Sequence, residues 1–393
     1  MTVAFGSSPA SAVPITIFNA DGFNEGFNDT TPAAPVGGNP GTTLGAQRLF
    51  LFQYAADAWA LRLGGDVPVI VKAGFQSLGG DQFSATLGAA RPTSLERDFP
   101  GAPKILTWYS AALNHQLAGE DRNNLTNSCD SGDLVGGKCA EILTRFNSDV
   151  DGTVLGSVDF YYGIDGNNGS DLDFLSVLLH EIAHGLGIIS LIDPATGRIS
   201  PDPDNDTCQT CSDAFSSNLE NPSFNPKQVS MMTNQQRRQS ILDDSKLVWF
   251  GPAVKAASGL LNTGKRGDGA VQIFAPSTYQ PGSSTSHVDT DLSPNELMEP
   301  FITPPPKTLD FTLAMLEDMG WETVDVPKCG DANESKTITS ADAHIILRAS
   351  VGLVECPAHY CDVNLTRGVT SADALVILRR AVGQSVVLKC PLA

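Results

Sequence analysis

The residues with the clearest chemical potential are two histidines, four positions apart, with a glutamate directly after the first. His180 and His184 lie in a segment, residues 171–187, whose apolar side chains recur at helical spacing. Both imidazoles therefore project from one face of a predicted helix, about 6 Å apart along its axis, where they can share one metal ion. Glu181 lies beside the open coordination position, and a carboxylate there can take a proton from water and hand it to a leaving amine. The pattern predicts a metal site with Glu181 as general base and then general acid.

This HExxH arrangement is typical of zinc peptidases, although a buried helix can also carry these three residues by accident. Histidine accounts for only six of the 393 residues, so the accidental reading is the less favoured one. Ser170 or Asp171 is expected to cap the start of the helix. Gly185 with Gly187 is expected to end it, because glycine enters a left-handed turn without steric cost. Such an abrupt end leaves room for a further ligand from a later part of the chain.

A catalytic zinc usually takes three protein ligands, and the helix supplies two. Of the four other histidines, two belong to a C-terminal repeat, and His115 lies on a short predicted helix between polar neighbours, where a surface position is expected. His287 remains, in a polar, loop-like stretch, and is the predicted third ligand. The alternative is a glutamate ligand, Glu296 or Glu299. That alternative needs a second helix, and four prolines interrupt or end the segment.

The elements that must position these residues alternate between helix and strand. Strands are expected at residues 13–18, 67–75, 105–109, 156–162 and 270–274. The helix predicted at residues 171–187 is called the metal helix below. Further helices are expected at residues 43–63, 111–117, 140–146, 233–244, 252–261 and 308–321. The stretch 193–226, rich in Pro, Asp, Asn and Ser, is predicted to be an irregular loop. This order predicts an α+β fold, with residues 1–324 forming one domain and residues 325–393 a small all-α domain.

Composition restricts the classes of protein to consider. The formal net charge of −19 argues against a nucleic-acid binder, because phosphate contacts need clustered Lys and Arg. No apolar run reaches 18 residues, so no membrane span is predicted. The first basic residue is Arg48, so either the protein is cytoplasmic or a signal peptide has been cleaved from it. We expect a monomer.

The eight cysteines favour the second option. Cys129 with Cys139, and Cys208 with Cys211, form local pairs in polar loops, and the other four lie in the last 65 residues. Local pairing suits disulfides in an oxidising compartment, and hence a secreted protein. A structural zinc site is the alternative for four of them, but the one CxxC couple has no matching second couple.

The C-terminal residues contain an internal repeat. Residues 330–352 match residues 361–383 with an offset of 31, and each copy is an acidic loop followed by an amphipathic helix. Positions 1, 3, 5, 7, 9 and 12 of the two twelve-residue loops are Asp331, Asn333, Ser335, Thr337, Thr339 and Asp342, and Asp362, Asn364, Thr366, Gly368, Thr370 and Asp373. Calcium accepts oxygen ligands at this spacing. A helix pair without a bound ion is the alternative, because position 5 is not acidic in either loop.

The motif HEIAHGLG, followed far downstream by SHVDTDLSPNELMEP at residues 286–300, resembles the metzincin metallopeptidases, most closely the leishmanolysin-like branch. Common metzincins place a third histidine ten positions after the first, where this chain has Ser190. The leishmanolysin-like branch has an insertion before a third histidine that precedes an ELM methionine turn, which matches His287 and Met298. The resemblance covers residues 171–321. It implies a metzincin-like catalytic domain, a zinc cofactor, a protein or peptide substrate, and a role for Met298 as an apolar floor beneath the ligands. Val288 departs from the branch, which has an aromatic residue after the histidine.

The repeat resembles a type I dockerin, with DxN, SAD and ILR elements in both copies. This resemblance implies bound calcium and a cohesin-like partner, although Ser335 and Thr366 stand where the family has acidic ligands. We therefore expect a secreted zinc endopeptidase with a dockerin-like tail for attachment. The alternative is a non-catalytic binding or adhesion protein that retains a metallopeptidase scaffold. The intact His180, Glu181 and His184 favour the enzyme.

Overall fold

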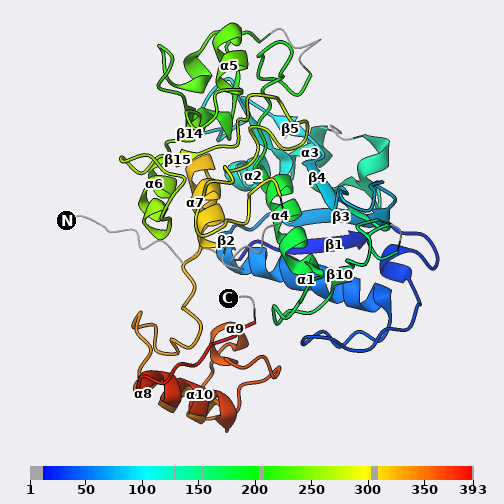
Figure 1. Ribbon diagram of the computed structural model, residues 1–393, viewed down its shortest axis with the longest axis vertical. Coiled ribbons are helices and arrows are strands. Elements are labelled where there is room, and N and C mark those ends of the chain that lie inside the picture. Colours follow the sequence, from blue (N-terminus) through cyan, green and yellow to red (C-terminus); the bar gives the residue numbers. More distant parts are fainter. Residues whose placement is uncertain (1–11, 127–129, 153, 203–207, 302–308, 392–393) are drawn as a thin grey trace.

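The computed structural model describes residues 12–126, 130–152, 154–202, 208–301 and 309–391, and it has the mixed α+β character that the sequence predicts (Figure 1). The α-helices in these residues are α1 Leu44–Arg62, α2 Ala111–Ala118, α3 Arg122–Thr126, α4 Phe174–Leu186, α5 Asn234–Ser240, α6 Pro252–Ala257, α7 Asp310–Met319, α8 Ser340–Ala349, α9 Ala358–Cys361 and α10 Ser371–Ala381. The strands are β1 Ile15–Asn19, β2 Leu63–Gly64, β3 Val69–Gln76, β4 Gly88–Pro92, β5 Leu95–Glu96, β6 Thr107–Ser110, β7 Leu134–Val135, β8 Lys138–Cys139, β9 Ile142–Asn147, β10 Phe160–Tyr161, β11 Leu172–Asp173, β12 Ser212–Asp213, β13 Leu219–Glu220, β14 Val248–Trp249, β15 Val271–Gln272 and β16 Glu322–Thr323.

A four-stranded sheet in the order β1-β3-β9-β4 supports the metal helix. Its first three strands run parallel, and β4 runs antiparallel to β9 at the edge. Along β3 the side chains of Val69, Val71 and Ala73 are fully buried, whereas the residues between them are partly exposed. The sheet therefore has one apolar face that must be covered.

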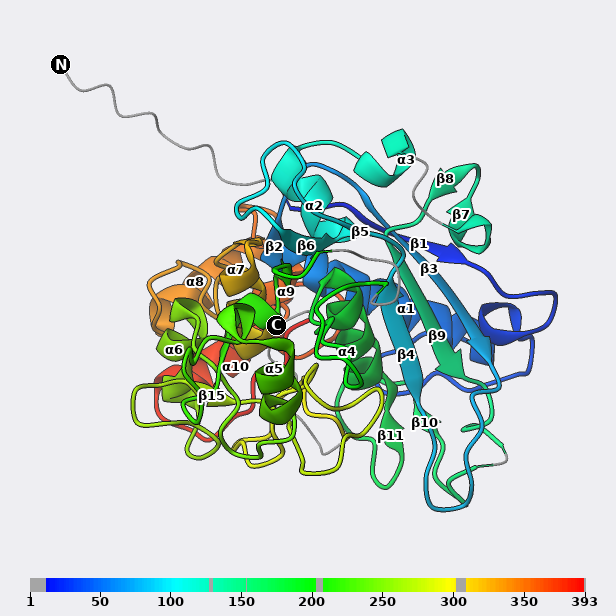
Figure 2. The same ribbon diagram turned by 90° about the horizontal axis from the view of Figure 1, so that it is seen from above.

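Helices α1 and α4 cover this face. Phe52 of α1 and Phe174 of α4 both pack against Phe146 of β9, with ring centroids 5.6 and 5.2 Å apart. Edge-to-face aromatic pairs of this kind stabilise a core beyond the area they bury. Figure 2 shows β4 and β9 side by side with α4 next to β4. The metal helix thus lies against the edge of the sheet.

Tertiary contacts fix both ends of α4. It begins after Asp173, whose carboxylate accepts the backbone N–H of Ser176 at 3.3 Å, so the cap predicted at Ser170 or Asp171 lies two or three residues too early. Gly187 ends the helix with a φ of 129°, as the sequence predicts. Gly185 has another role: a β-carbon there would lie 2.2 Å from Cγ2 of Ile142, so its absence allows α4 to approach β9.

The repeat has a hydrophobic core of its own. Its buried residues include Ala343, Ile346, Ala374 and Ile377 of the paired helices α8 and α10, and this cluster is separate from the main core. Strand β16 pairs with β2 of the larger domain just before the connector to the repeat. No helix in the described part of the chain is long and apolar enough to cross a membrane.

The local pair Cys208 and Cys211 forms a disulfide as predicted, and the four C-terminal cysteines, whose connectivity the sequence leaves open, pair among themselves. Cys208 pairs with Cys211, Cys329 with Cys390, and Cys356 with Cys361. Cys139 is also disulfide-bonded, and its predicted partner Cys129 lies outside the described residues.

Three predicted segments differ from the structure. The irregular loop predicted at residues 193–226 contains the short strands β12 and β13, which pair with β6 and β14. The helix predicted at residues 140–146 is replaced by strand β9, in which buried Ile142 and Thr144 alternate with less buried neighbours, as suits a strand whose one face meets α4. The strand predicted at 156–162 is reduced to Phe160–Tyr161. In the C-terminal half of the larger domain, α5, α6, α7 and β15 lie within their predicted ranges, and Thr308, the predicted start of the last helix, lies outside the described residues.

Candidate metal centre

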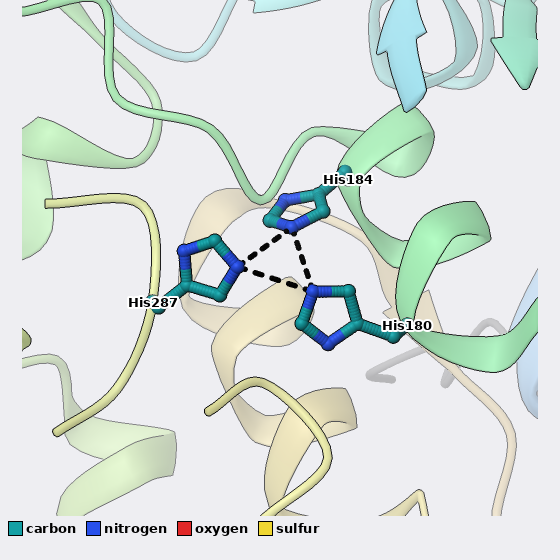
Figure 3. Close-up of side chains that lie close together, drawn as sticks. All are labelled: His180, His184 and His287. Atoms are coloured by element: carbon teal, nitrogen blue, oxygen red, sulfur yellow. Dashed lines mark hydrogen bonds between the residues drawn. The ribbon is translucent and has the colours of Figure 1, made fainter. Parts of the chain in front are cut away.

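The three predicted ligands come together at one point (Figure 3). The Nε2 atoms of His180 and His184, one turn apart on α4, are 3.0 Å from each other. Nε2 of His287 lies 3.1 Å from each of them, although it is 103 positions beyond His184. Zinc bonds to nitrogen of about 2.0–2.1 Å bring tetrahedral ligands to within about 3.5 Å of one another, so the spacing fits one ion.

Backbone hydrogen bonds with Phe274 hold the segment that carries His287. The backbone N–H of Phe274 donates to the carbonyl of His287 at 2.9 Å, and Thr285 donates back to Phe274 at 2.8 Å. The loop after the metal helix holds the same segment, because the N–H of Ser190 donates to Oγ of Ser286 at 3.1 Å. Ser190 therefore anchors the residue next to the third ligand, in a chain that has no histidine at this position.

The hydrogen-bond partner of Nδ1 shows which nitrogen of each ring carries the proton. Nδ1 of His180 lies 2.7 Å from the carbonyl oxygen of Leu297, Nδ1 of His184 lies 2.6 Å from that of Ile188, and Nδ1 of His287 lies 2.8 Å from that of Ser283. A carbonyl oxygen only accepts hydrogen bonds, so each Nδ1 carries the proton. Each neutral ring then presents an Nε2 lone pair toward the other two.

Burial keeps the rings neutral. It lowers the pKa of His180, and together with the neighbouring imidazoles it lowers the pKa of His184 to about 3 and that of His287 well below its usual range. Hydrogen bonds among the three Nε2 atoms would need protonated rings, which these pKa values oppose. A cation would satisfy the three converging lone pairs, and imidazole nitrogen is a ligand that suits zinc.

The side chain of Glu181, on α4, lies against the edge strand β4. It is 7% exposed, and burial raises the pKa of its carboxyl to about 8. A β-carbon added to Gly88 of β4 would lie 2.9 Å from Cγ of Glu181 and 3.2 Å from its Oε1, so the strand has no side chain where the carboxylate sits. A cation at the three histidines would oppose the rise in pKa and favour the carboxylate form.

The ELM segment contacts both sides of the site. Leu297 accepts the hydrogen bond from His180, and the carbonyl of the next residue, Met298, accepts the N–H of Val288 at 2.9 Å. Met298 is fully buried. This turn therefore links the metal helix to the residue that follows His287.

The glutamates considered as alternative ligands pair with each other. Glu296 and Glu299 are 5% and 4% exposed, and Oε1 of Glu299 accepts the N–H of Glu296 at 2.9 Å. Burial, with the charge of Glu299, raises the pKa of Glu296 to about 7. Neither belongs to the two clusters with metal-ligand spacing that the described residues contain, so His287 is the ligand that the geometry favours.

Sequence reasoning placed His115 at the surface, and this was wrong. The residue is fully buried, with Nδ1 3.6 Å from Oε1 of Glu141 and 4.0 Å from Oδ1 of Asp121. These three have metal-ligand spacing, but Nε2 of His115 accepts the N–H of Asn123 at 3.2 Å. Nδ1 then carries the ring proton and cannot bind a metal. His115 and Glu141 form a buried polar contact that the local sequence does not reveal, because Glu141 comes from a distant segment, directly before β9.

The first residue of each acidic loop is buried and accepts backbone N–H groups. Asp331 accepts those of Ser335 and Lys336 at 2.9 and 2.6 Å. Asp362 accepts those of Thr366, Arg367 and Gly368 at 3.0, 2.7 and 3.1 Å. Both carboxylates are at most 2% exposed. The repeat therefore preserves one loop conformation in both copies.

The other predicted calcium ligands line the same loops. Asn333 and Asn364 each accept an N–H from position 5, and the hydroxyl of Ser335 donates to the carbonyl of Thr337. Thr339 and Thr370 cap α8 and α10 in capping boxes with Asp342 and Asp373.

The two loops differ at position 12. Oδ1 of Asp342 accepts the N–H of Asn333 at 3.0 Å, whereas the buried Oδ1 of Asp373 has no hydrogen-bond partner. A buried, unpaired carboxylate oxygen is costly, and a calcium ion would satisfy it. The second loop is the better candidate for an ion.

No protein-family model matches this chain, and a comparison with curated proteins found no relative.

Proposed function

We propose that this protein is a zinc-dependent endopeptidase of metzincin type, most similar to the leishmanolysin-like branch. One observation carries the proposal: three neutral imidazoles, each fixed by a backbone carbonyl, direct their Nε2 lone pairs to one point. The adjacent Glu181 completes the set of groups that hydrolysis of a peptide bond needs.

The edge strand supports a peptide as substrate. Strand β4 pairs with β9 on one side and is the last strand in the order of its sheet, and its Gly88 adjoins Glu181. An extended peptide can add to such an edge as a further strand, with affinity from main-chain hydrogen bonds. Because these bonds do not depend on side chains, peptides of many sequences can bind in this way. A substrate bound in this way would run past the general base.

The residues have separate roles in the proposed reaction. His180, His184 and His287 would hold zinc, which when bound would supply a Lewis acid and lower the pKa of water to about 7. Glu181 takes the proton of the attacking water and delivers it to the leaving amine. The carbonyls of Leu297, Ile188 and Ser283 keep each ring in the tautomer that leaves Nε2 free.

The test combines metal analysis with one substitution. Glu181→Gln has nearly the same shape but cannot accept the proton, so cleavage of unfolded protein or quenched peptides should fall about 10²–10⁴-fold while zinc stays bound. Exposed Glu322→Gln serves as the control and should retain activity. Equal cleavage by wild type and Glu181→Gln, or activity without zinc, would refute the mechanism. Zinc bound without any cleavage would favour the non-catalytic scaffold.

We also propose that the dockerin-like repeat binds calcium and attaches the enzyme to a cohesin-like partner. Equivalent apolar side chains lie exposed on its two helices, Leu347 with Leu378 at 49% and 43%, and just after them, Val351 with Val382 at 67% and 73%. Exposed apolar residues at matched positions suit a partner surface. The disulfides are compatible with secretion, the proposed location of a monomeric enzyme.

A further inference from the structure

The second acidic loop, residues 362–373, reaches the larger domain, whereas the described residues show no contact of this kind for the first loop. Nη2 of Arg367, at position 6, donates to the carbonyl of Gly38 at 2.5 Å, and its guanidinium lies 5.9 Å from the centre of the Phe50 ring in α1. Nζ of Lys389 donates to the carbonyl of Asp165 at 3.3 Å. The backbone N–H of Lys389 donates to Val363 at 3.0 Å, so Lys389 belongs to the same loop region.

The acceptors form one surface on the larger domain, which we call the docking platform: Gly37, Gly38, Ile164 and Asp165. The N–H of Ile164 donates to the carbonyl of Gly37 at 2.8 Å, which joins the two turns. A β-carbon on Gly37 would lie 2.2 Å from the hydroxyl of Tyr161, and that hydroxyl donates to Asp165 at 2.6 Å. The platform therefore offers two carbonyl oxygens in fixed positions to two cationic side chains.

The conformation of the loop determines where Arg367 points. Its backbone N–H donates to Oδ2 of Asp362 at 2.7 Å, and its φ is 67°, in the left-handed region. Lys336, the equivalent residue of the first loop, has a φ of 66° and makes the same backbone contact with Asp331 at 2.6 Å. The two loops are thus alike in backbone and differ in what the side chain at position 6 contacts.

The second loop contains two buried carboxylates. Asp362 and Asp373 are both fully buried, and neither belongs to an ion pair within the described part of the chain. Oδ1 of Asp373 has no hydrogen-bond partner, and burying two carboxylates without a cation is costly, so an empty loop is expected to open. An open loop would no longer hold the backbone of Arg367 in its left-handed conformation, and the contact with Gly38 would be lost.

We infer that a calcium-filled second loop docks the repeat domain onto the docking platform of the larger domain through Arg367 and Lys389. This inference rests on the calcium binding proposed above and is independent of peptidase activity. It assigns different roles to the two copies: the second loop makes an intramolecular contact, and the first leaves Lys336 exposed to solvent.

The test uses the full chain, small-angle X-ray scattering and calcium titration calorimetry. Arg367→Gly removes the side chain and suits the left-handed backbone, so the loop should keep its calcium. In calcium, this variant should show a maximum dimension larger by up to about 13–18 Å, the extended reach of the four or five connector residues that follow β16 at about 3.3–3.6 Å per residue. Lys336→Gly is the matched control and should remain as compact as wild type. Wild type in a calcium chelator should expand like Arg367→Gly.

Two results would overturn the inference. If Arg367→Gly and wild type scatter alike in calcium, Arg367 does not dock the domain. If the wild type is equally compact with calcium and with chelator, the docking is independent of the ion. The calorimetry separates these results from a failure of the calcium proposal itself, because a chain that binds no calcium gives no heat of binding in any variant.

Discussion

Gly88→Ala should lower the catalytic rate without removing the metal. The added β-carbon would lie 2.9 Å from Cγ of Glu181, 3.2 Å from its Cδ and 3.2 Å from its Oε1. Carbon atoms in contact prefer about 3.5–4.0 Å, so the Glu181 side chain must move by about 0.6 Å or more. A misplacement of about 1 Å at a reacting group can cost about 10²-fold in rate. We therefore expect kcat to fall about 10- to 100-fold.

The assay compares kcat, KM and zinc content of three proteins. In Gly88→Ala the three histidines are untouched, so zinc content should equal that of wild type. Ala89→Ser is the control, because Ala89 is exposed and successive strand residues point to opposite faces. It should behave like wild type. A Gly88→Ala protein with unchanged kcat would refute the argument that the position of Glu181 against β4 is needed for catalysis, and loss of zinc would show that the substitution acts on the fold.

The remaining predictions concern the third ligand, the buried pair and the calcium loops. His287→Ala should lose zinc and activity together, as measured by metal analysis and peptide cleavage, whereas retained zinc would restore the glutamate alternative. Burial raises the pKa of Glu141 to about 8, so ionisation costs the folded state stability as pH rises from about 5 to 8. Over that range the difference in free energy of unfolding between Glu141→Gln and wild type, measured in denaturant titrations, should shift in favour of the variant by up to about 1.4 kcal/mol per pH unit. A difference that does not change with pH would contradict the raised pKa of Glu141. His115→Ala should leave zinc bound but lower the free energy of unfolding by about 1–3 kcal/mol, because the N–H of Asn123 loses its acceptor. Millimolar calcium should raise the melting temperature of the repeat domain in the full chain, and Asp362→Ala should reduce the shift; an unchanged shift would exclude the second loop as the site.

Two errors of the sequence-based prediction meet at His115 and Glu141: His115 was placed at the surface, and residues 140–146 were predicted to be helical. Polar neighbours around His115 indicated a surface helix, and residues 140–146 showed too short an apolar run to separate helix from strand. In the folded chain β9 lies inside the sheet, and its first residues bring Glu141 within 3.6 Å of His115. The pairing partner of a strand is absent from its own sequence, so neither the strand nor the contact could be derived locally.

Local spacing by itself determined that His180, Glu181 and His184 lie on one helix. A helix repeats every 3.6 residues, so positions 180 and 184 share a face whatever surrounds them. The offset of 31 likewise fixed two loops with equivalent oxygen positions, and the structure has the same backbone at Lys336 and Arg367. These features depend on residues within about one turn or one loop of each other, which a sequence displays directly.

Only the tertiary structure decided how the site is completed. His287 meets His184 across 103 positions because Phe274 and Met298 hold its segment by backbone hydrogen bonds and the N–H of Ser190 donates to the hydroxyl of Ser286. Three carbonyl groups of the main chain set the tautomers of the three rings. Every residue has such a carbonyl, so a sequence motif cannot identify the three that act here. Gly88 faces Glu181, and Arg367 reaches Gly38, only once separate elements have packed. Each of these contacts joins groups distant in sequence, and their free energy depends on a geometry that exists only in the folded chain.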